Sequence, residues 1–238
     1  MPIHSSFLIH WTGKKQLTQA SRANREEKVR LYVDLLRDIM CDGFLMNAGQ
    51  ETLHRRGGLR LEVHQLPYLC FSEVKVSQVK LHRKQYGSLG IGVSRDFVRA
   101  RSGGPVLYVP GGKRGLVIRG LADLQTIMRK YPPPEGKCES SIDVIAAFCK
   151  ELPPNDRKLP VYDEMEWRVV CTNKKGKHYR VGGEGTIEKI YLKLQPGDIK
   201  VVVFPDKHVR EKAFKDDCIA GLLAQVRIQM LADACAHF

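Results

Sequence analysis

The spacing of apolar positions predicts a chain that mixes strands and helices. Short apolar runs bounded by polar residues are typical of strands, and apolar residues three or four positions apart are typical of helices. The predicted strands are residues 7–10, 59–63, 66–71, 89–93, 106–109, 116–118, 167–171, 191–194 and 199–204. The predicted helices are residues 24–40, 72–85, 95–100, 121–128, 142–149 and, as one helix or two, 207–236. The strands are spaced too irregularly for repeated βαβ units, so the fold class is α+β.

Breaks in the pattern indicate where the elements end. Gly43 can cap the C-terminus of the first long helix, and three prolines starting at Pro132 end a later one. Residues 47–58 and 150–160 are polar or rich in proline and glycine, which predicts loops. Residues 173–185 predict a basic, glycine-rich hairpin. There is no clear linker or internal repeat.

Composition narrows the class of protein. Hydrophobic residues make up 43% of the 238 residues, enough for a sizeable core. No run approaches the roughly 20 apolar residues of a membrane span, and we expect no signal peptide. Seven scattered cysteines favour reduced thiols in the cytoplasm, and their spacing predicts no metal site. We therefore expect one cytoplasmic domain over residues 1–238, in which 207–236 is a C-terminal helical segment.

The net charge predicts a polyanionic partner. The formal charge is +13 at pH 7, which favours contact with nucleic acid or with an acidic protein surface. The cations are spread along the chain, which is also typical of a solvated surface. They gather at Lys14–Lys15, Arg55–Arg56, His82–Lys84, Arg99–Arg101, Lys174–Lys177 and Lys207–Lys215.

Residues 70–109 carry the most unusual local chemistry. The buried-looking strand before them stops at the polar pair Ser72 and Glu73, and Gly87, Gly90 and Gly92 follow within a short apolar run. Glycine in a strand often marks a close approach of a ligand or of another backbone. The stretch therefore predicts either the wall of a binding site or a tightly packed strand–helix–strand unit.

Polar residues at three strand boundaries form a candidate site. The glycine run has neither the dinucleotide fingerprint nor the phosphate-loop spacing. A histidine with an aromatic residue and a later glutamate suits chemistry on a sugar–base bond, because the carboxylate can stabilise an oxocarbenium-like centre. The candidate residues are His10, Trp11, Thr12, Ser72, Glu73, Tyr86, Glu164 and Glu166.

Each of these candidates also has a structural interpretation. A lone histidine at the end of a strand is often a packing residue, as His10 could be. Glu166 and Arg168 are two positions apart on a predicted strand, so they face the same side and could form a salt bridge across a sheet edge. Ser72 could cap the following helix, with Glu73 near its positive end.

Three motifs, in order, resemble the AbiGi family of bacterial abortive-infection proteins. They are FLIHWTG near the start, the run CFSEVKVSQV…YGSLGIGVSRDFV…GGPVLYV, and EMEWRVV later in the chain. The resemblance spans roughly residues 7–205. It implies a phage-defence protein of the toxin–antitoxin kind, with a cognate toxin or antitoxin as partner. The family's label of antitoxin names a role in a system and no chemistry.

The same layout is similar to ADP-ribosyltransferase folds, including DarT-like toxins that modify nucleic acid. This similarity implies a mixed, largely antiparallel split sheet with flanking helices, and NAD as the substrate. It implies the catalytic groups Glu166, His10 and, less directly, Glu164. It implies an NAD site formed by His10, Trp11, Thr12, Ser72 and Tyr86, in which Ser72 or Tyr86 shapes the nicotinamide pocket.

Two functions follow from these observations. The first is an NAD-dependent, ADP-ribosyltransferase-like toxin that acts on nucleic acid or another macromolecule. The alternative is a non-catalytic antitoxin or partner-binding component of an abortive infection pair. Whether the chain is an enzyme depends on which of the two is right.

Overall fold

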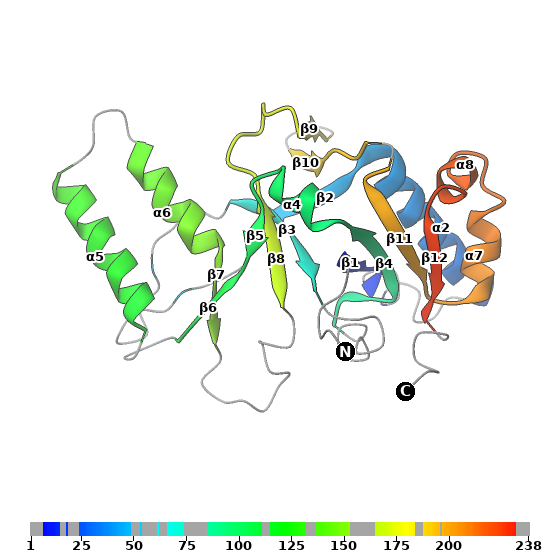
Figure 1. Cartoon of the computed structure of the whole chain (residues 1–238), viewed down its shortest axis with the longest axis horizontal. Coiled ribbons are helices and arrows are strands. Elements are labelled where there is room, and N and C mark those ends of the chain that lie inside the picture. Colours follow the sequence, from blue (N-terminus) through cyan, green and yellow to red (C-terminus); the bar gives the residue numbers. More distant parts are fainter. Residues whose placement is uncertain are drawn as a thin grey trace.

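The protein is described by a computed structural model in which an α+β fold is built on one large mixed sheet (Figure 1). This confirms the predicted fold class. The structure describes residues 7–14, 18, 24–48, 53, 61, 66–73, 85–110, 115–131, 137–152, 165–183, 188–195 and 197–231.

The described elements are short, apart from two long helices. The helices are α2 (Arg25–Asp42), α4 (Arg95–Arg99), α5 (Leu116–Lys130), α6 (Lys137–Ala147), α7 (Lys207–Ala213) and α8 (Ala220–Leu223). The strands are β1 (Leu8–Thr12), β2 (Phe44–Ala48), β3 (Pro67–Ser72), β4 (Leu89–Val93), β5 (Gly104–Pro105), β6 (Leu107–Pro110), β7 (Cys149–Leu152), β8 (Glu166–Val170), β9 (Tyr179–Gly182), β10 (Lys189–Leu192), β11 (Ile199–Phe204) and β12 (Arg227–Met230).

The large sheet branches at β3. Its main path runs β12-β11-β4-β1-β3-β2-β10-β9, and β8 pairs with β3 and with the short β5. Tyr68 of β3 is paired with both β2 and β8, and Ser72 with both β1 and β8. Strands β1 and β2 therefore share one edge of β3, while β8 occupies the other. All these pairs are antiparallel except β11 with β12.

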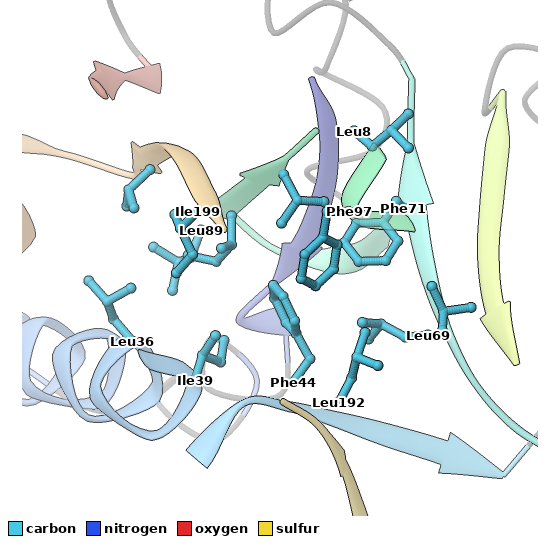
Figure 2. Packing of buried hydrophobic residues seen from close by; sticks show 14 of the residues in the cluster. Leu8, Leu36, Ile39, Phe44, Leu69, Phe71, Leu89, Phe97, Leu192 and Ile199 are labelled. Carbon is cyan, nitrogen blue, oxygen red and sulfur yellow. The ribbon is translucent and has the colours of Figure 1, made fainter. Parts of the chain in front are cut away.

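The main core lies on the face of the sheet that α2 and α7 cover (Figure 1). Aromatic rings form its centre: Phe44 and Phe71 have centroids 5.7 Å apart, and Phe71 and Phe97 have centroids 6.4 Å apart, all edge to face. Figure 2 shows these rings gathered between the strands, with Leu8 and Leu192 beside them. Aromatic burial and edge-to-face packing together make this cluster a main source of stability.

A second core belongs to a separate group of elements, here called the small lobe: α5, α6, β6 and β7. Strands β6 and β7 form their own two-stranded parallel sheet. Helices α5 and α6 pack over it at the end of the molecule farthest from α7 (Figure 1). The residues buried there include Val109, Ile118, Leu121, Ile142 and Ala146.

A third apolar cluster, around Trp11, covers the opposite face of β4. A Cβ atom at Gly90 would lie 2.9 Å from the Trp11 ring, and one at Gly92 would lie 2.3 Å from Cγ1 of Val201. These glycines therefore make room for neighbouring side chains of the sheet. Of the two interpretations of this stretch, the structure supports tight packing at these two positions.

Most predicted strands and helices are present within a few residues of their expected bounds. Helix α2 begins after Asn24, whose side chain accepts a hydrogen bond from the backbone N–H of Glu27, and it ends at Gly43 as predicted. The predicted strands at 89–93 and 199–204 match β4 and β11. The predictions at 59–63 and 72–85 fall largely outside the described residues.

Several predictions were wrong, and for most of them pairing with distant strands decided the outcome. Residues 116–118 start α5 instead of forming a strand, since their apolar pattern continues into that helix. In the predicted C-terminal helical segment, Arg227–Met230 is strand β12, which pairs in parallel with β11. The predicted loops at 47–58 and 150–160 begin with strand residues of β2 and β7. The described part of the predicted hairpin, residues 173–183, supplies strand β9, whose partner is β10.

The variant Gly92→Ala should lower the free energy of unfolding by about 1–3 kcal/mol, because its methyl group overlaps a buried β-branched side chain that has no room to move. Urea denaturation followed by circular dichroism measures the change. The control is Gly221→Ala in α8, where an added Cβ meets nothing within 4 Å, and stability should stay equal or rise by up to about 1 kcal/mol. Equal losses in both variants would contradict the packing role of Gly92.

Candidate functional site

Glu166, the predicted catalytic carboxylate, forms a buried charge cluster with Arg168 and Lys150. Nε of Arg168 donates a hydrogen bond to Oε1 of Glu166 at 2.6 Å, and Nζ of Lys150, from β7, donates to Oε2 at 2.9 Å. The side chain of Arg168 is 0% exposed and that of Glu166 is 6% exposed. The predicted salt bridge between Glu166 and Arg168 is confirmed, but it is buried between β3 and β5 and does not lie at a sheet edge.

The buried charge cluster joins the small lobe to the large sheet. Nη1 of Arg168 donates to the carbonyl oxygen of Ala147 at 2.6 Å, at the end of α6, and to that of Cys149 at 3.4 Å, at the start of β7. The backbone N–H of Glu166 donates to the hydroxyl of Tyr108 in β6 at 3.0 Å. Three elements of the small lobe are therefore held by two residues of β8.

Electrostatics keeps Glu166 ionised. Burial by itself raises the pKa of Glu166, but the charges of Arg168 and Lys150 outweigh this effect and hold the pKa below its usual value. Cys70 on β3 lies opposite Arg168, and burial raises the pKa of its thiol well above the usual range. Both oxygens of Glu166 are engaged by cations, an arrangement that suits a structural ion pair.

Glu73, just after β3, is itself buried and forms a second, partly buried ion pair with α4. Its Oε2 accepts a hydrogen bond from Nε1 of Trp167 at 2.7 Å, and its Oε1 pairs with Arg95 at the start of α4. The guanidinium of Arg99 lies 5.8 Å from the centre of the Trp167 ring. Sequence reasoning placed Glu73 near the start of a following helix but missed these contacts, because Trp167 is 94 residues away.

His10 is a partly buried residue that packs against the aromatic rings of the main core. Its Nδ1 donates a hydrogen bond to the carbonyl oxygen of Cys70 at 2.9 Å, and its ring contacts those of Phe44 and Phe71 at 5.3 and 6.1 Å between centroids. Burial lowers the pKa of His10, although the Cys70 bond opposes this, so the ring is neutral at pH 7. These contacts agree with the structural interpretation of His10.

The other predicted residues of β1 divide between the two faces of the sheet. Side chains alternate along a strand, so His10 and Thr12 face the main core and Trp11 faces the opposite side. Tyr86 packs against the same cluster as Trp11. The structure therefore brings Trp11 and Tyr86 together and separates them from His10.

Ser72 and Glu166 are brought together on neighbouring strands. They are directly opposite one another in the β3–β8 register, and Ser72 is also opposite Ile9 of β1. Ser72 and Glu166 therefore face the same side of the sheet as Trp11, away from His10. Glu164 lies outside the described residues.

The family described as "Putative abortive phage resistance protein AbiGi, antitoxin" matches residues 44–205. That range is more than half of the chain, and this chain therefore belongs to the AbiGi family, as the resemblance predicted. The range runs from the start of β2 to just beyond β11 and includes the buried charge cluster, whereas the FLIHWTG motif lies outside it. No curated protein and no solved structure matches the chain.

The likeness to ADP-ribosyltransferase folds has no support among solved structures. The expected mixed, largely antiparallel sheet is present, but this property alone does not identify an ADP-ribosyltransferase fold. Within the part of the chain that the structure describes, no helix is long and apolar enough to cross a membrane.

The variant Arg168→Met should destabilise the protein by about 3–5 kcal/mol, because it leaves Glu166 buried with only one of its two cations. The matched control is Arg180→Met. Arg180 pairs with Asp42 and stacks on a tyrosine as Arg168 does, but its side chain is 44% exposed, so the loss should stay below about 1 kcal/mol. Similar losses in chemical denaturation would show that the cluster is not a special constraint.

Folding stability should fall as the pH drops below 6.5, partly because of His10. The unfolded histidine titrates near its usual pKa of 6.5, whereas the pKa in the folded protein is lower. Below pH 6.5 the unfolded state therefore takes up a proton that the folded state does not, and stability decreases until the pH passes the folded pKa.

The variant His10→Asn should flatten this pH dependence, because its amide nitrogen can donate to Cys70 in place of Nδ1 but does not titrate. Urea midpoints at pH 7.5 and 5.5 should differ more in the parent than in the variant. The pKa of His178 is also lowered, and since His178 is unchanged in both proteins the difference isolates His10. Parallel pH profiles would contradict the buried neutral state of His10.

Proposed function

We propose that this chain is the antitoxin of an abortive infection pair and that it acts by binding its cognate toxin, without chemistry of its own. The observation that carries the proposal is the family match, whose description names an antitoxin and whose range covers most of the fold. The cytoplasm is the compartment in which such a pair would meet.

The contacts of the candidate catalytic residues support a non-catalytic role. The two oxygens of Glu166 are bonded to Arg168 and Lys150, so an incoming ribose would have to displace a buried cation. The side chain of His10 lies on the face of the sheet opposite to Glu166, and its Nδ1 donates a hydrogen bond to the backbone carbonyl oxygen of Cys70. Breaking a buried pair by removing one partner is costly, and this cost opposes the use of Glu166 as a transfer catalyst.

The rival proposal is an NAD-dependent, ADP-ribosyltransferase-like toxin. One observation favours it: Ser72 and Glu166 are directly opposite one another and share a face of the sheet with Trp11 and Tyr86. In that case NAD would be the substrate, and nucleic acid, which the charge of +13 attracts, would be a candidate target.

Growth of cells that express the chain distinguishes the two proposals. We expect no growth defect from the chain alone, a defect from the product of the neighbouring gene alone, and restored growth when both are expressed. The two proteins should also co-purify as a complex. We expect these outcomes because an antitoxin of this kind neutralises its toxin by binding to it.

The opposite pattern would overturn the antitoxin proposal. Growth arrest by the chain alone, relieved in the Glu166→Gln variant, would identify a toxin. Incubation with labelled NAD and with RNA, DNA and protein acceptors provides the chemical readout. Label transfer that Glu166→Gln abolishes would support the transferase.

A further inference from the structure

Helix α5 presents apolar side chains on two of its faces. One set, Ile118, Leu121 and Ala122, is buried in the small lobe. A second set is exposed by 39–67% and is here called the α5 stripe: Leu116, Val117, Leu124, Ile127 and Tyr131. Five large exposed apolar residues within sixteen positions are uncommon on a surface that contacts only water.

The spacing of the α5 stripe is that of a helix-packing seam. Val117, Leu124 and Tyr131 are seven residues apart, and Gly120 and Ile127 fill the intermediate positions at the same interval. This is the a/d pattern by which one helix packs against another. A Cβ atom at Gly120 would meet nothing within 4 Å, so the middle of the seam is open to the approach of a second helix.

The position of α5 leaves this seam facing outward. Helix α5 is the outermost element at its end of the molecule, and its inner side meets α6 and β6 (Figure 1). The family match also includes the whole of α5. Among the described residues, no element covers the α5 stripe.

The charges around the α5 stripe favour an acidic occupant. The exposed charged residues of α5 are three cations and one anion: Arg119, Arg129, Lys130 and Asp123. A second copy of the chain would bring two basic helices, each on a chain with a net charge of +13, against one another. A helix with carboxylates beside its apolar face would instead pair with Arg119 and Lys130.

We propose that the α5 stripe is the surface on which this protein binds an amphipathic, acidic helix of its cognate toxin. The apolar face of that helix would pack on Leu124 and Ile127, and its carboxylates would lie near Arg119 and Lys130. This inference rests on the proposed antitoxin function and assigns that function to a surface that includes none of the residues of the buried charge cluster.

The test measures binding of the purified full chain to the protein encoded by the neighbouring gene, by isothermal titration calorimetry. The double variant Leu124→Glu/Ile127→Glu should lower the affinity by about tenfold or more, because it places carboxylates at the centre of the seam. The variant Arg119→Glu/Lys130→Glu should also weaken binding and reduce its dependence on salt. Glutamate is a good helix former and all four positions are exposed, so both variants should keep the fold.

The control is Val181→Glu on the edge strand β9, whose side chain is 47% exposed and therefore comparable with the stripe. Its affinity should equal that of the parent. Equal binding by the parent and both α5 variants would overturn this inference and leave the antitoxin function intact. A parent chain that does not bind the neighbouring gene product would instead overturn the proposed function and, with it, this inference.

A second copy of this chain is the other partner that could cover the α5 stripe. Sedimentation velocity of the chain alone should show a monomer as the concentration is raised, with the α5 variants unchanged. A dimer that Leu124→Glu/Ile127→Glu dissociates would overturn the assignment of the α5 stripe to a toxin helix.

Discussion

The buried contact of Glu166 with Arg168 and Lys150 is the constraint on which the arrangement of the two lobes depends. Strand β8 supplies the first two groups and β7 the third, so the interaction crosses from the large sheet to the small lobe. Arg168 also donates to the carbonyl oxygens of Ala147 at the end of α6 and of Cys149 at the start of β7. Burying these charges is costly, and removing one of them would leave a partner buried without its counter-charge, so the cluster favours one arrangement of α6, β6 and β7 against β8.

The alternation of side chains along the strands limits what chemistry the sheet can assemble. It places His10 against Phe44 and Phe71 and Trp11 on the other face of the sheet, so the two side chains point away from one another. The glycines of β4 lie beneath Trp11 and Val201, where a Cβ atom would overlap a neighbour. His10 and Trp11 therefore have packing contacts in this fold, and Glu166 has ion-pair contacts.

Contacts between residues close in the sequence could be predicted, whereas most contacts between distant strands could not. The caps of α2 and the pairing of Glu166 with Arg168 depend on residues two to four positions apart, and both could be predicted. Lys150 could not, because it reaches Glu166 only through the pairing of β6 with β7, in a stretch that reads as a loop. Strand β12 was missed for the same reason, since its backbone hydrogen bonds go to β11 and its apolar spacing also fits a helix.

The family match is to a phage-resistance antitoxin family, and our proposals give the two features different roles: the charge cluster holds the lobes together, and the exposed face of α5 would bind the toxin. Replacing the cluster by apolar residues tests this division, because buried ion groups can often be replaced in this way without loss of folding. The decisive measurement is growth rescue by the combined variant Lys150→Met, Glu166→Leu, Arg168→Met, confirmed as folded by circular dichroism. We expect it to neutralise the neighbouring toxin as the parent does. A folded variant that still binds the toxin as the parent does but fails to rescue growth would show that the carboxylate has a role beyond assembly, and it would contradict this account.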